Sequence, residues 1–378
     1  MNVPKLRFKD NNDNDYPQWE KKLIKDILKI YHGKDYKNEP NEKKLYPVLG
    51  TGGIITYIDK FLCDWECVLI GRKGTINKPQ YMKTPFWSVD TLFYSKPKLK
   101  QNPKFQYYLF QNINWKIYDE STGVPSLSAS TIEHINKLIP IYAEQEKIAN
   151  FLTTVDKKIT NLENIITSLE NQKKGLLQQI FNQKLRFKDE NGNNYPNWEK
   201  KKLGELFIFK QGYQIPAEKQ LKIYKEGYLR YLYISDFLSN KNILYVKKDD
   251  MDTINKSDIA IANTGNTSGK FFRGQSGILS NNMFVIKNDE KFILNDFLFF
   301  YLETDLYDTQ LKKFFNSSGQ PHLGHKNMSN ITIIYPQKQE QTKIADFLSA
   351  FDRKIDNQKA QLEHWQQIKK GLLQQMFV

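Results

Sequence analysis

A long internal repeat constrains this chain more than any other feature of its sequence. The string LRFKDNNDNDYPQWEKK at residues 6–22 returns as LRFKDENGNNYPNWEKK at residues 185–201, an offset of 179. Further along, KKGLLQQIF at residues 173–181 returns as KKGLLQQMF at residues 369–377, an offset of 196. The chain therefore consists of two homologous units, roughly 6–181 and 185–377, and the second unit carries about 17 extra residues between its matching ends.

The two units resemble each other at their ends and differ in their middles. The segment GTGGIITYIDKFLCDWECVLIGRKGTINK at residues 50–78 hardly aligns with KQGYQIPAEKQLKIYKEGYLRYLYISDFL at residues 210–238. A shared frame that carries two different surfaces suggests two related modules that recognise different targets. Drift of an unconstrained segment would produce the same pattern, so this alternative stays open.

Composition narrows the class of partner. A chain of 378 residues has room for two or three domains, and 39% hydrophobic residues suffice for folded cores. The net charge of +14 favours a polyanion, because each Lys or Arg that neutralises a phosphate releases a counterion. Charge alone does not separate DNA from RNA or from acidic membranes. With two cysteines, no signal peptide and no apolar run of about 18 residues, we expect a cytoplasmic protein that does not enter a membrane.

Each unit ends in a helix with the apolar spacing of a coiled coil. Apolar residues follow one another in alternating steps of four and three residues, and mostly polar residues lie between them. Each helix spans about 35 residues, or about 50 Å at 1.5 Å per residue, and its apolar stripe needs a partner. The expected helix-pair interface consists of Ile148, Leu152, Val155, Ile159, Leu162, Ile166, Leu169, Leu176, Ile344, Leu348, Phe351, Ile355, Leu362, Trp365 and Leu372.

Two lysines in the apolar stripe bear on the orientation of the helices. A parallel pairing in register would place Lys173 against Lys369, two like charges without compensation. Antiparallel pairing avoids this contact and suits a pseudo-two-fold arrangement. We therefore expect an antiparallel coiled coil, with the alternative that each helix packs only on its own globular part.

The rest of each unit has mixed signals that indicate an α+β domain. Short β-rich stretches are separated by turn residues, and a helical piece follows the last stretch in each unit. The strands are expected at residues 67–71, 91–95, 258–262 and 282–287, and the helical pieces at 102–113 and 294–304. The fold class is thus α+β, with two tandem α/β domains that are each followed by a long helix.

The motifs expected of an enzyme are not found in the sequence. Cys63 and Cys67 have no second pair of ligands, so they are interpreted as core residues, and His322 with His325 is interpreted as a polar loop and not as a metal site. The string NTGNTSGK at residues 263–270 lacks the spacing of a phosphate-binding loop. We found no nuclease set and no Asn/Asp-Pro-Pro-aromatic motif of an amino-methyltransferase. We predict that the chain binds and does not catalyse, with no catalytic residue, no metal and no bound cofactor.

Two polar loops are attractive as binding surfaces. They are GRKGTINK at residues 71–78 and NTGNTSGKFFRGQ at residues 263–275, and a Ser/Thr-Gly turn follows later in each unit, at 122–123 and 318–319. Arg and Lys suit guanine edges, Asn and Gln suit adenine edges, and all of them suit phosphates. The predicted DNA-binding residues are Arg72, Lys73, Thr75, Lys78, Asn263, Asn266, Thr267, Lys270, Arg273, Gln275, Gln320 and His322.

Several strings of the sequence resemble those of a known protein family. EQEKIANFLTTVDKKI at residues 144–159 and EQTKIADFLSAFDRKI at 340–355 are similar to the shared helical regions of specificity subunits of Type I restriction–modification enzymes. The strings TGVPSL and SGQPHL before these helices and the openings WEKK at Trp19 and Trp198 look like that family too. The resemblance covers essentially the whole chain, although the two variable middles match no particular member.

The resemblance implies a DNA-recognition subunit without catalytic residues of its own. Two target recognition domains, at residues 1–143 and 182–338, would each read one half of a bipartite site on double-stranded DNA, and long helices at 144–181 and 339–378 would set the spacer. Two methylation subunits and the restriction subunits would bind this chain. S-adenosylmethionine, ATP and magnesium would belong to those partner subunits. The DNA-contacting side chains differ between members, so none is carried over.

The helix length gives a further expectation, and two alternatives remain. Half-sites read from one face of DNA lie roughly 34–36 Å apart, so we predict roughly 3–5 base pairs read on each side of an unread gap of about 5–8. The alternatives are a self-contained DNA methyltransferase and a coiled-coil adaptor that binds RNA or DNA. A methyltransferase would transfer methyl groups without partners, and an adaptor would not change DNA sequence preference when its middle segment is exchanged.

Overall fold

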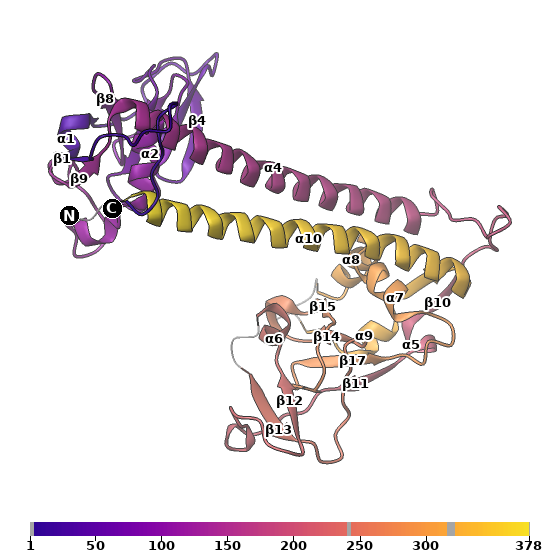
Figure 1. The fold of residues 1–378 in the computed structure, drawn as a ribbon. Helices are drawn as coiled ribbons and strands as arrows, with labels where there is room; N and C mark the ends of the chain where they lie inside the picture. Colours follow the sequence, from indigo (N-terminus) through magenta and orange to yellow (C-terminus); the bar gives the residue numbers. More distant parts are fainter. Residues whose placement is uncertain (1–3, 240–242, 316–321, 378) are drawn as a thin grey trace. The chain divides into compact units, whose positions relative to one another are not determined.

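The computed structural model describes residues 4–239, 243–315 and 322–377 and divides into two compact units. The first unit comprises Met1–Ile165 and Gln358–Val378, and the second comprises Ile166–Asn357 (Figure 1). Each unit therefore contains one globular part and half of each long helix. The duplication seen in the sequence is thus a duplication of a composite unit, to which both helices contribute.

The described residues of the first globular part form three small sheets. A four-stranded antiparallel sheet has the order β2-β8-β5-β6, and a three-stranded sheet has the order β4-β3-β7 with β3 and β7 parallel. A third sheet pairs β1 with β9. The strands are β1 (Glu20–Leu23), β2 (Leu28–Tyr31), β3 (Tyr46–Gly50), β4 (Gly53–Ile58), β5 (Cys67–Gly71), β6 (Gln80–Met82), β7 (Trp87–Ser88), β8 (Leu92–Pro97) and β9 (Asn136–Ile139). Short helices are α1 (Ile24–Ile27), α2 (Pro103–Asn112), η1 (Trp115–Tyr118) and α3 (Ala129–Glu133).

The second unit repeats this topology strand for strand. Its sheets have the orders β11-β17-β14-β15, β13-β12-β16 and β10-β18, and β12 and β16 are parallel as β3 and β7 are. The strands are β10 (Glu199–Lys202), β11 (Ile208–Gln211), β12 (Tyr228–Leu232), β13 (Leu244–Lys247), β14 (Ile259–Ala262), β15 (Phe271–Phe272), β16 (Ile278–Leu279), β17 (Met283–Lys287) and β18 (Thr332–Tyr335). The helices are α5 (Leu203–Leu206), η2 (Ala217–Lys219), α6 (Ile234–Leu238), η3 (Gly265–Thr267), α7 (Asn295–Leu302), α8 (Asp305–Lys312) and α9 (His325–Ser329). The middles of the two units have diverged in sequence while they kept one fold.

Local sequence explains the elements that were expected. The strands β5, β8, β14 and β17 and the helices α2 and α7 confirm the predicted β-rich and helical stretches. The buried run CVLIG of β5 forms an inner strand, and Asn102 caps α2 by accepting a hydrogen bond from the Phe105 N–H, with Pro103 in the first turn. The main difference between the units is a connection. Two residues, Thr51 and Gly52, join β3 to β4, whereas a longer segment containing α6 joins β12 to β13.

The two long helices, α4 (Tyr142–Phe181) and α10 (Lys338–Met376), are antiparallel within each unit (Figure 1). In the first unit the Lys369 Nζ lies 2.8 Å from Asp156, and in the second the Lys173 Nζ lies 2.6 Å from Asp352. The two ion pairs are equivalent at the offset of 196, and they confirm the expected antiparallel orientation. The charges of the two seam lysines are thus neutralised by the opposite helix.

The residues expected between the helices fall into groups. Ile148 and Leu152 belong to the globular core of the first unit, and Ile344 and Leu348 belong to that of the second. The alternative that the helices pack on their own globular parts therefore describes the first turns of both. Buried residues outside the described globular cores are Val155, Leu162, Ile166, Leu169 and Ile355. Partly buried residues are Ile159, Leu176, Phe351, Leu362, Trp365 and Leu372.

A buried glutamate at the start of each long helix holds the entry segment of its unit. Both Glu144 and Glu340 are fully buried. Glu144 accepts hydrogen bonds from the Arg7 guanidinium at 3.1 and 2.7 Å and from the Trp19 indole at 3.0 Å. The hydrogen bond to Glu144 raises the pKa of Arg7 above its ordinary value. Glu340 accepts the same set of bonds from Arg186 and Trp198, at 3.1, 2.6 and 3.3 Å.

The two ends of the chain meet in the first unit. The Leu6 N–H donates to the Gln375 carbonyl at 3.1 Å, and the Leu185 N–H donates to the Gln179 carbonyl at 3.1 Å. These bonds are equivalent in the repeat, but the second joins residues that are close in the chain and the first joins opposite ends. The final turn of α10 therefore occupies in the first unit the place that the final turn of α4 occupies in the second.

A charge exchange tests the helix orientation. Changing Lys369 to Asp places two carboxylates against each other, and we expect the free energy of unfolding of the first unit to fall by about 1–3 kcal/mol. The second change Asp156→Lys should restore most of this loss, because it recreates the ion pair in reverse. Denaturant titration of both variants measures the effect. Asp352→Lys is the matched control, since it should not rescue Lys369→Asp.

Among the described residues, no helix has the length and apolar character that a membrane crossing requires.

Candidate nucleic-acid interface

In the first unit, the loop that follows β5 lies against the Ser/Thr-Gly turn segment. The Leu127 N–H donates to the Arg72 carbonyl at 2.9 Å, and the Gly74 N–H donates to the Pro125 carbonyl at 2.8 Å. Lys73 forms a β-bridge with Ser126. The two segments that were separate candidates in the sequence, residues 71–78 and 122–127, therefore form one surface.

The second unit repeats this arrangement after β14. The Leu323 N–H donates to the Asn263 carbonyl at 2.9 Å, and Thr264 forms a β-bridge with His322. This bond corresponds to the one between Leu127 and Arg72, although the two loops have unrelated sequences. Gln320, another predicted DNA-binding residue, lies outside the described residues. The predicted turn at 318–319 also lies outside them. In each unit the fold thus brings a variable loop against the residues that follow the predicted turn, Ser126 and Leu127 in the first unit and His322 and Leu323 in the second.

The basic side chains of the first loop reach solvent. Arg72, Lys73 and Lys78 are exposed, while Thr75 is half-buried. The Arg72 Nη1 donates to the Asp90 carbonyl at 3.2 Å, which holds the guanidinium at the surface without neutralising it. All three cations are therefore available to phosphates or to base edges.

Lys78 also lines a polar groove of about 500 Å³ within the first unit. The end of α10 contributes Lys369, Lys370 and Gln374 to this groove, and α2 contributes Asn112. Asp156 neutralises Lys369 and also accepts a hydrogen bond from the Tyr108 hydroxyl at 2.7 Å; burial raises the pKa of Tyr108. Among the described residues, no carboxylate pairs with Lys78 or Lys370, so the groove keeps two free positive charges.

The residues predicted in the second loop have different environments. Asn266, Lys270 and His322 are exposed. Thr267 is half-buried and donates from its hydroxyl to the Thr264 carbonyl at 3.4 Å. Asn263 is only 5% exposed, and its amide donates to the Asn281 carbonyl at 3.3 Å. Asn263 therefore shapes the loop, and the exposed side chains around it form the surface.

Arg273 and Gln275 are engaged inside the second unit. The Arg273 Nη1 lies 2.6 Å from an Asp296 carboxylate oxygen, and its guanidinium stacks 3.8 Å from the centre of the Phe299 ring. The Gln275 amide accepts a hydrogen bond from Arg230 at 2.8 Å and donates to the Asp236 carbonyl at 3.2 Å. These contacts hold both side chains to the domain, so the loop offers Asn266 and Lys270 more freely than these two.

The two cysteines and His325 are packed inside their domains. Cys63 and Cys67 are both buried as free thiols, with their sulfurs 3.8 Å apart. His325 packs against Phe284 with ring centres 4.9 Å apart, and burial followed by the neighbouring His322 lowers its pKa. Within the described ranges, no group of three or more His, Cys, Asp or Glu side chains could hold a metal ion.

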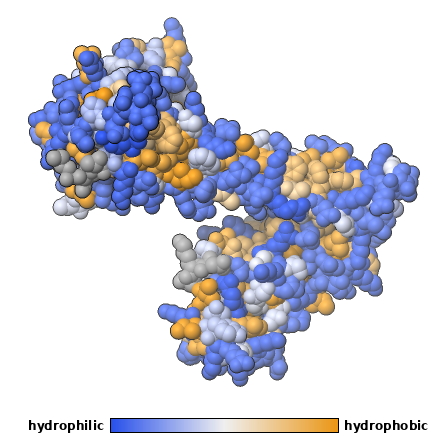
Figure 2. Space-filling model, in the orientation of Figure 1, coloured by the Kyte–Doolittle hydropathy of each residue, from blue (hydrophilic) through white to orange (hydrophobic). Residues whose placement is uncertain are grey.

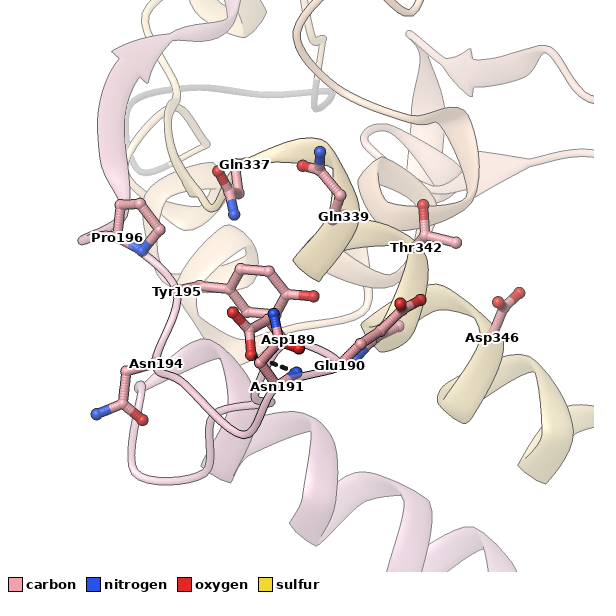
Figure 3. A pocket seen from close by; sticks show the side chains of 11 residues that line it. Asp189, Glu190, Asn191, Asn194, Tyr195, Pro196, Gln337, Gln339, Thr342 and Asp346 are labelled. Atoms are coloured by element: carbon pink, nitrogen blue, oxygen red, sulfur yellow. Dashed lines mark hydrogen bonds between the residues drawn. The ribbon is translucent and has the colours of Figure 1, made fainter.

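A larger polar hollow of about 790 Å³ lies elsewhere in the second unit, between the turn after Lys188 and the first turns of α10 (Figure 3). Asp189 lines it and accepts hydrogen bonds from the backbone N–H groups of Asn191 and Asn193 at 2.9 and 2.8 Å. These bonds lower the pKa of Asp189. The carboxylate is thus used to close the turn, and none of the predicted DNA-binding residues lines this hollow.

Comparison with known proteins identifies relatives of both halves. The family model described as "Type I restriction modification DNA specificity domain" matches residues 16–171 and 195–364. A putative type I restriction enzyme MjaX specificity subunit from Methanocaldococcus jannaschii is 22% identical over 97% of this chain and 94% of its own length. The MjaVIII specificity subunit of the same organism is 29% identical over 53% of this chain, and the match spans about half (47%) of that relative.

Solved structures show the same fold over the whole chain. The crystal structure of a Type I restriction-modification system S subunit from M. genitalium has a TM-score of 0.68 at 19% identity. The match covers 100% of this chain and 99% of that chain. The likeness therefore extends to the duplicated globular parts and to the long helices that follow them.

Proposed function

Since this chain belongs to the family of Type I restriction modification DNA specificity domains, we propose that each of its globular parts reads one half of a split DNA site. The main support for this proposal is that the two units share one fold but differ in the side chains of their loops. Both units keep the same sheet topology and the same hydrogen bond from Leu127 or Leu323 to the variable loop, while the side chains on the loops differ. Two units with the same sheet topology and different loop side chains can recognise two different half-sites. The chain is a recognition subunit, and chemistry belongs to its partners.

The partners and the spacer complete the proposal. Residues 1–143 and 182–338 act as target recognition domains, and the helical segments 144–181 and 339–378 set the length of the unread gap. Two methylation subunits and the restriction subunits bind this chain, and they carry S-adenosylmethionine, ATP and magnesium in the cytoplasm. The equivalent features at the offset of 196 support two equivalent partners, because they would present similar surfaces twice.

An exchange of one middle segment tests the role of the domains. Replacing residues 23–120 by the matching segment of a relative should change one half of the methylated motif and leave the other half unchanged. Sequencing of methylated sites in cells that express the complete complex provides the readout. A motif that stays unchanged, or a motif without a gap, would contradict the proposal. Incubating the chain alone with DNA and labelled S-adenosylmethionine should give no transfer, whereas transfer would identify a self-contained methyltransferase.

Binding at different salt concentrations tests the exposed lysines. Lys78→Ala and Lys270→Ala should each weaken binding to all duplexes alike and reduce the slope of log K against log salt by about 0.9, because each variant loses one phosphate contact. Lys116→Ala serves as a control, since Lys116 is exposed in η1 and belongs to neither loop. An unchanged slope for both loop variants would remove these lysines from the interface.

A further inference from the structure

The hairpin between β3 and β4 lies beside the candidate loop of the first unit. A Cβ atom placed on Gly71 would be 3.2 Å from the Thr51 Cγ2 at the hairpin tip. The Gln80 amide donates to the Gly50 carbonyl at 2.8 Å and to the Thr51 carbonyl at 3.4 Å. The tip therefore lies against the start of the loop that carries Arg72, and it was not among the binding surfaces predicted from the sequence.

A β-bulge exposes two consecutive isoleucines on this hairpin. Val48 lies opposite Thr56 and Leu49 lies opposite Ile54, so Ile55 is the extra residue of β4. Successive side chains of a regular strand point to opposite faces, and one of two neighbours would be buried. Here Ile54 is 57% exposed and Ile55 is 53% exposed. Ile55 also lies over Gly50, where a Cβ would come within 2.8 Å of its Cδ1, so the glycine makes room for it.

An exposed pair of apolar side chains on an edge strand increases the risk of aggregation. β4 is the outer strand of its sheet, and apolar edges invite unwanted pairing with other chains. Figure 2 shows that hydrophobic side chains of the first unit reach a surface that is otherwise largely hydrophilic. In the second unit, the described residues of β13 pair with β12 in regular register, and Leu244 and Tyr245 are half-buried. Among the residues that the structure describes, the two equivalent strand pairs therefore differ by this bulge.

We propose that Ile54 and Ile55 read the methyl group of a thymine in the major groove of the first half-site. This inference rests on the proposed function and adds two specificity-determining residues to it. The major groove admits a two-stranded β-ribbon, and the thymine methyl is the apolar group that the base edges present there. Arg72 and Lys73 are exposed on the loop whose first residue, Gly71, lies against the hairpin tip, and such cations attract phosphates, which favours DNA over an apolar protein partner.

Duplexes with deoxyuridine provide the test, because deoxyuridine is thymidine without the methyl. The motif and the half read by the first domain are first determined by methylation sequencing of the original chain and of the 23–120 exchange. The complete complex should then lose about fourfold in affinity when one thymine of the first half is replaced, which equals about 0.8 kcal/mol for one methyl. The Ile54→Ala, Ile55→Ala double variant should bind the thymine duplex more weakly and show no further loss with deoxyuridine.

Control experiments distinguish a failure of methyl reading from a failure of the proposed DNA recognition. Leu99→Ala, at a residue 90% exposed in the same unit, should keep the fourfold response to deoxyuridine. Deoxyuridine in the second half should affect wild type and double variant equally. Methyl reading is overturned if the first half-site contains no thymine. It is also overturned if the affinity losses from the double variant and from deoxyuridine add up. In both cases the exchange of residues 23–120 can still support DNA recognition. The proposal is also overturned if the double variant loses affinity while deoxyuridine has no effect, and if the fluorescence of 2-aminopurine placed in the first half-site increases on binding. That result would indicate that the isoleucines insert between bases as a wedge. An exchange that leaves the motif unchanged overturns both proposals.

Discussion

Replacing Arg7 by alanine is expected to lower the free energy of unfolding of the first unit by about 3–5 kcal/mol. Arg7 supplies the positive charge against the fully buried Glu144, through two hydrogen bonds at 3.1 and 2.7 Å. Without it the carboxylate stays buried with the Trp19 indole as its remaining side-chain donor among the described residues. A buried charge that has lost its partner costs far more than the pair contributes when it is intact.

Hydrogen–deuterium exchange, resolved by peptide, measures this effect in each unit separately. Arg7→Ala should speed exchange in the first unit, and the matched variant Arg186→Ala should speed exchange in the second, because Glu340 is equally buried. Arg7→Lys keeps the charge but loses the planar fork, and we expect a smaller loss of about 1–2 kcal/mol. Equal protection in wild type and Arg7→Ala would show that the N-terminal segment does not stabilise its unit.

The second large effect is expected from a residue at the opposite end of the chain. Phe377→Ala should destabilise the first unit by about 3–5 kcal/mol, since truncation of a buried Phe leaves a cavity. The Phe377 side chain is buried and lies with its ring centre 5.5 Å from that of Phe105. Met376 and Leu373 belong to the same core. A change directly after the last turn of α10 should therefore loosen β2, β5 and β8, which lie more than 250 residues earlier in the chain.

The repeat supplies the matched control for this variant. Phe181 is the equivalent residue, and it packs 5.2 Å from Phe297 and 5.8 Å from Tyr301 in the core of the second unit. Phe181→Ala should speed hydrogen exchange in the second unit and leave the sheets of the first unit protected. If Phe377→Ala affected the two units equally, the final turn of α10 would not be a specific part of the first core.

The helices illustrate what periodicity in a sequence can and cannot predict. The alternation of four and three residues predicted both helices, and two lysines at equivalent places in the stripe favoured antiparallel pairing. The ion pairs of Lys369 with Asp156 and of Lys173 with Asp352 confirm that orientation. The spacing did not show which apolar residues pack in the globular cores and which pack between the helices. The same period is expected for both kinds of contact.

The candidate interface shows the same division. Composition pointed to the two polar loops, and the repeated turn segments were visible as strings. By residue type and position in the loop, Asn263 and Lys270 are equivalent candidates, but Asn263 is buried and structural while Lys270 lies on the surface. The exposed Ile54 and Ile55 were missed, since a β-bulge depends on which strand lies opposite and leaves no mark in local composition.

The sequence by itself determined the duplication, the long helices, the family resemblance and the separation of a repeated frame from variable loops. These are properties of spacing and identity along one chain. Only the tertiary structure decided that both middles share one sheet topology, that each variable loop is bonded to the segment after the predicted turn, and that the last turn of α10 completes the first core. These features are contacts between residues far apart in the chain, and their energies depend on burial and opposing charges that a linear string does not contain.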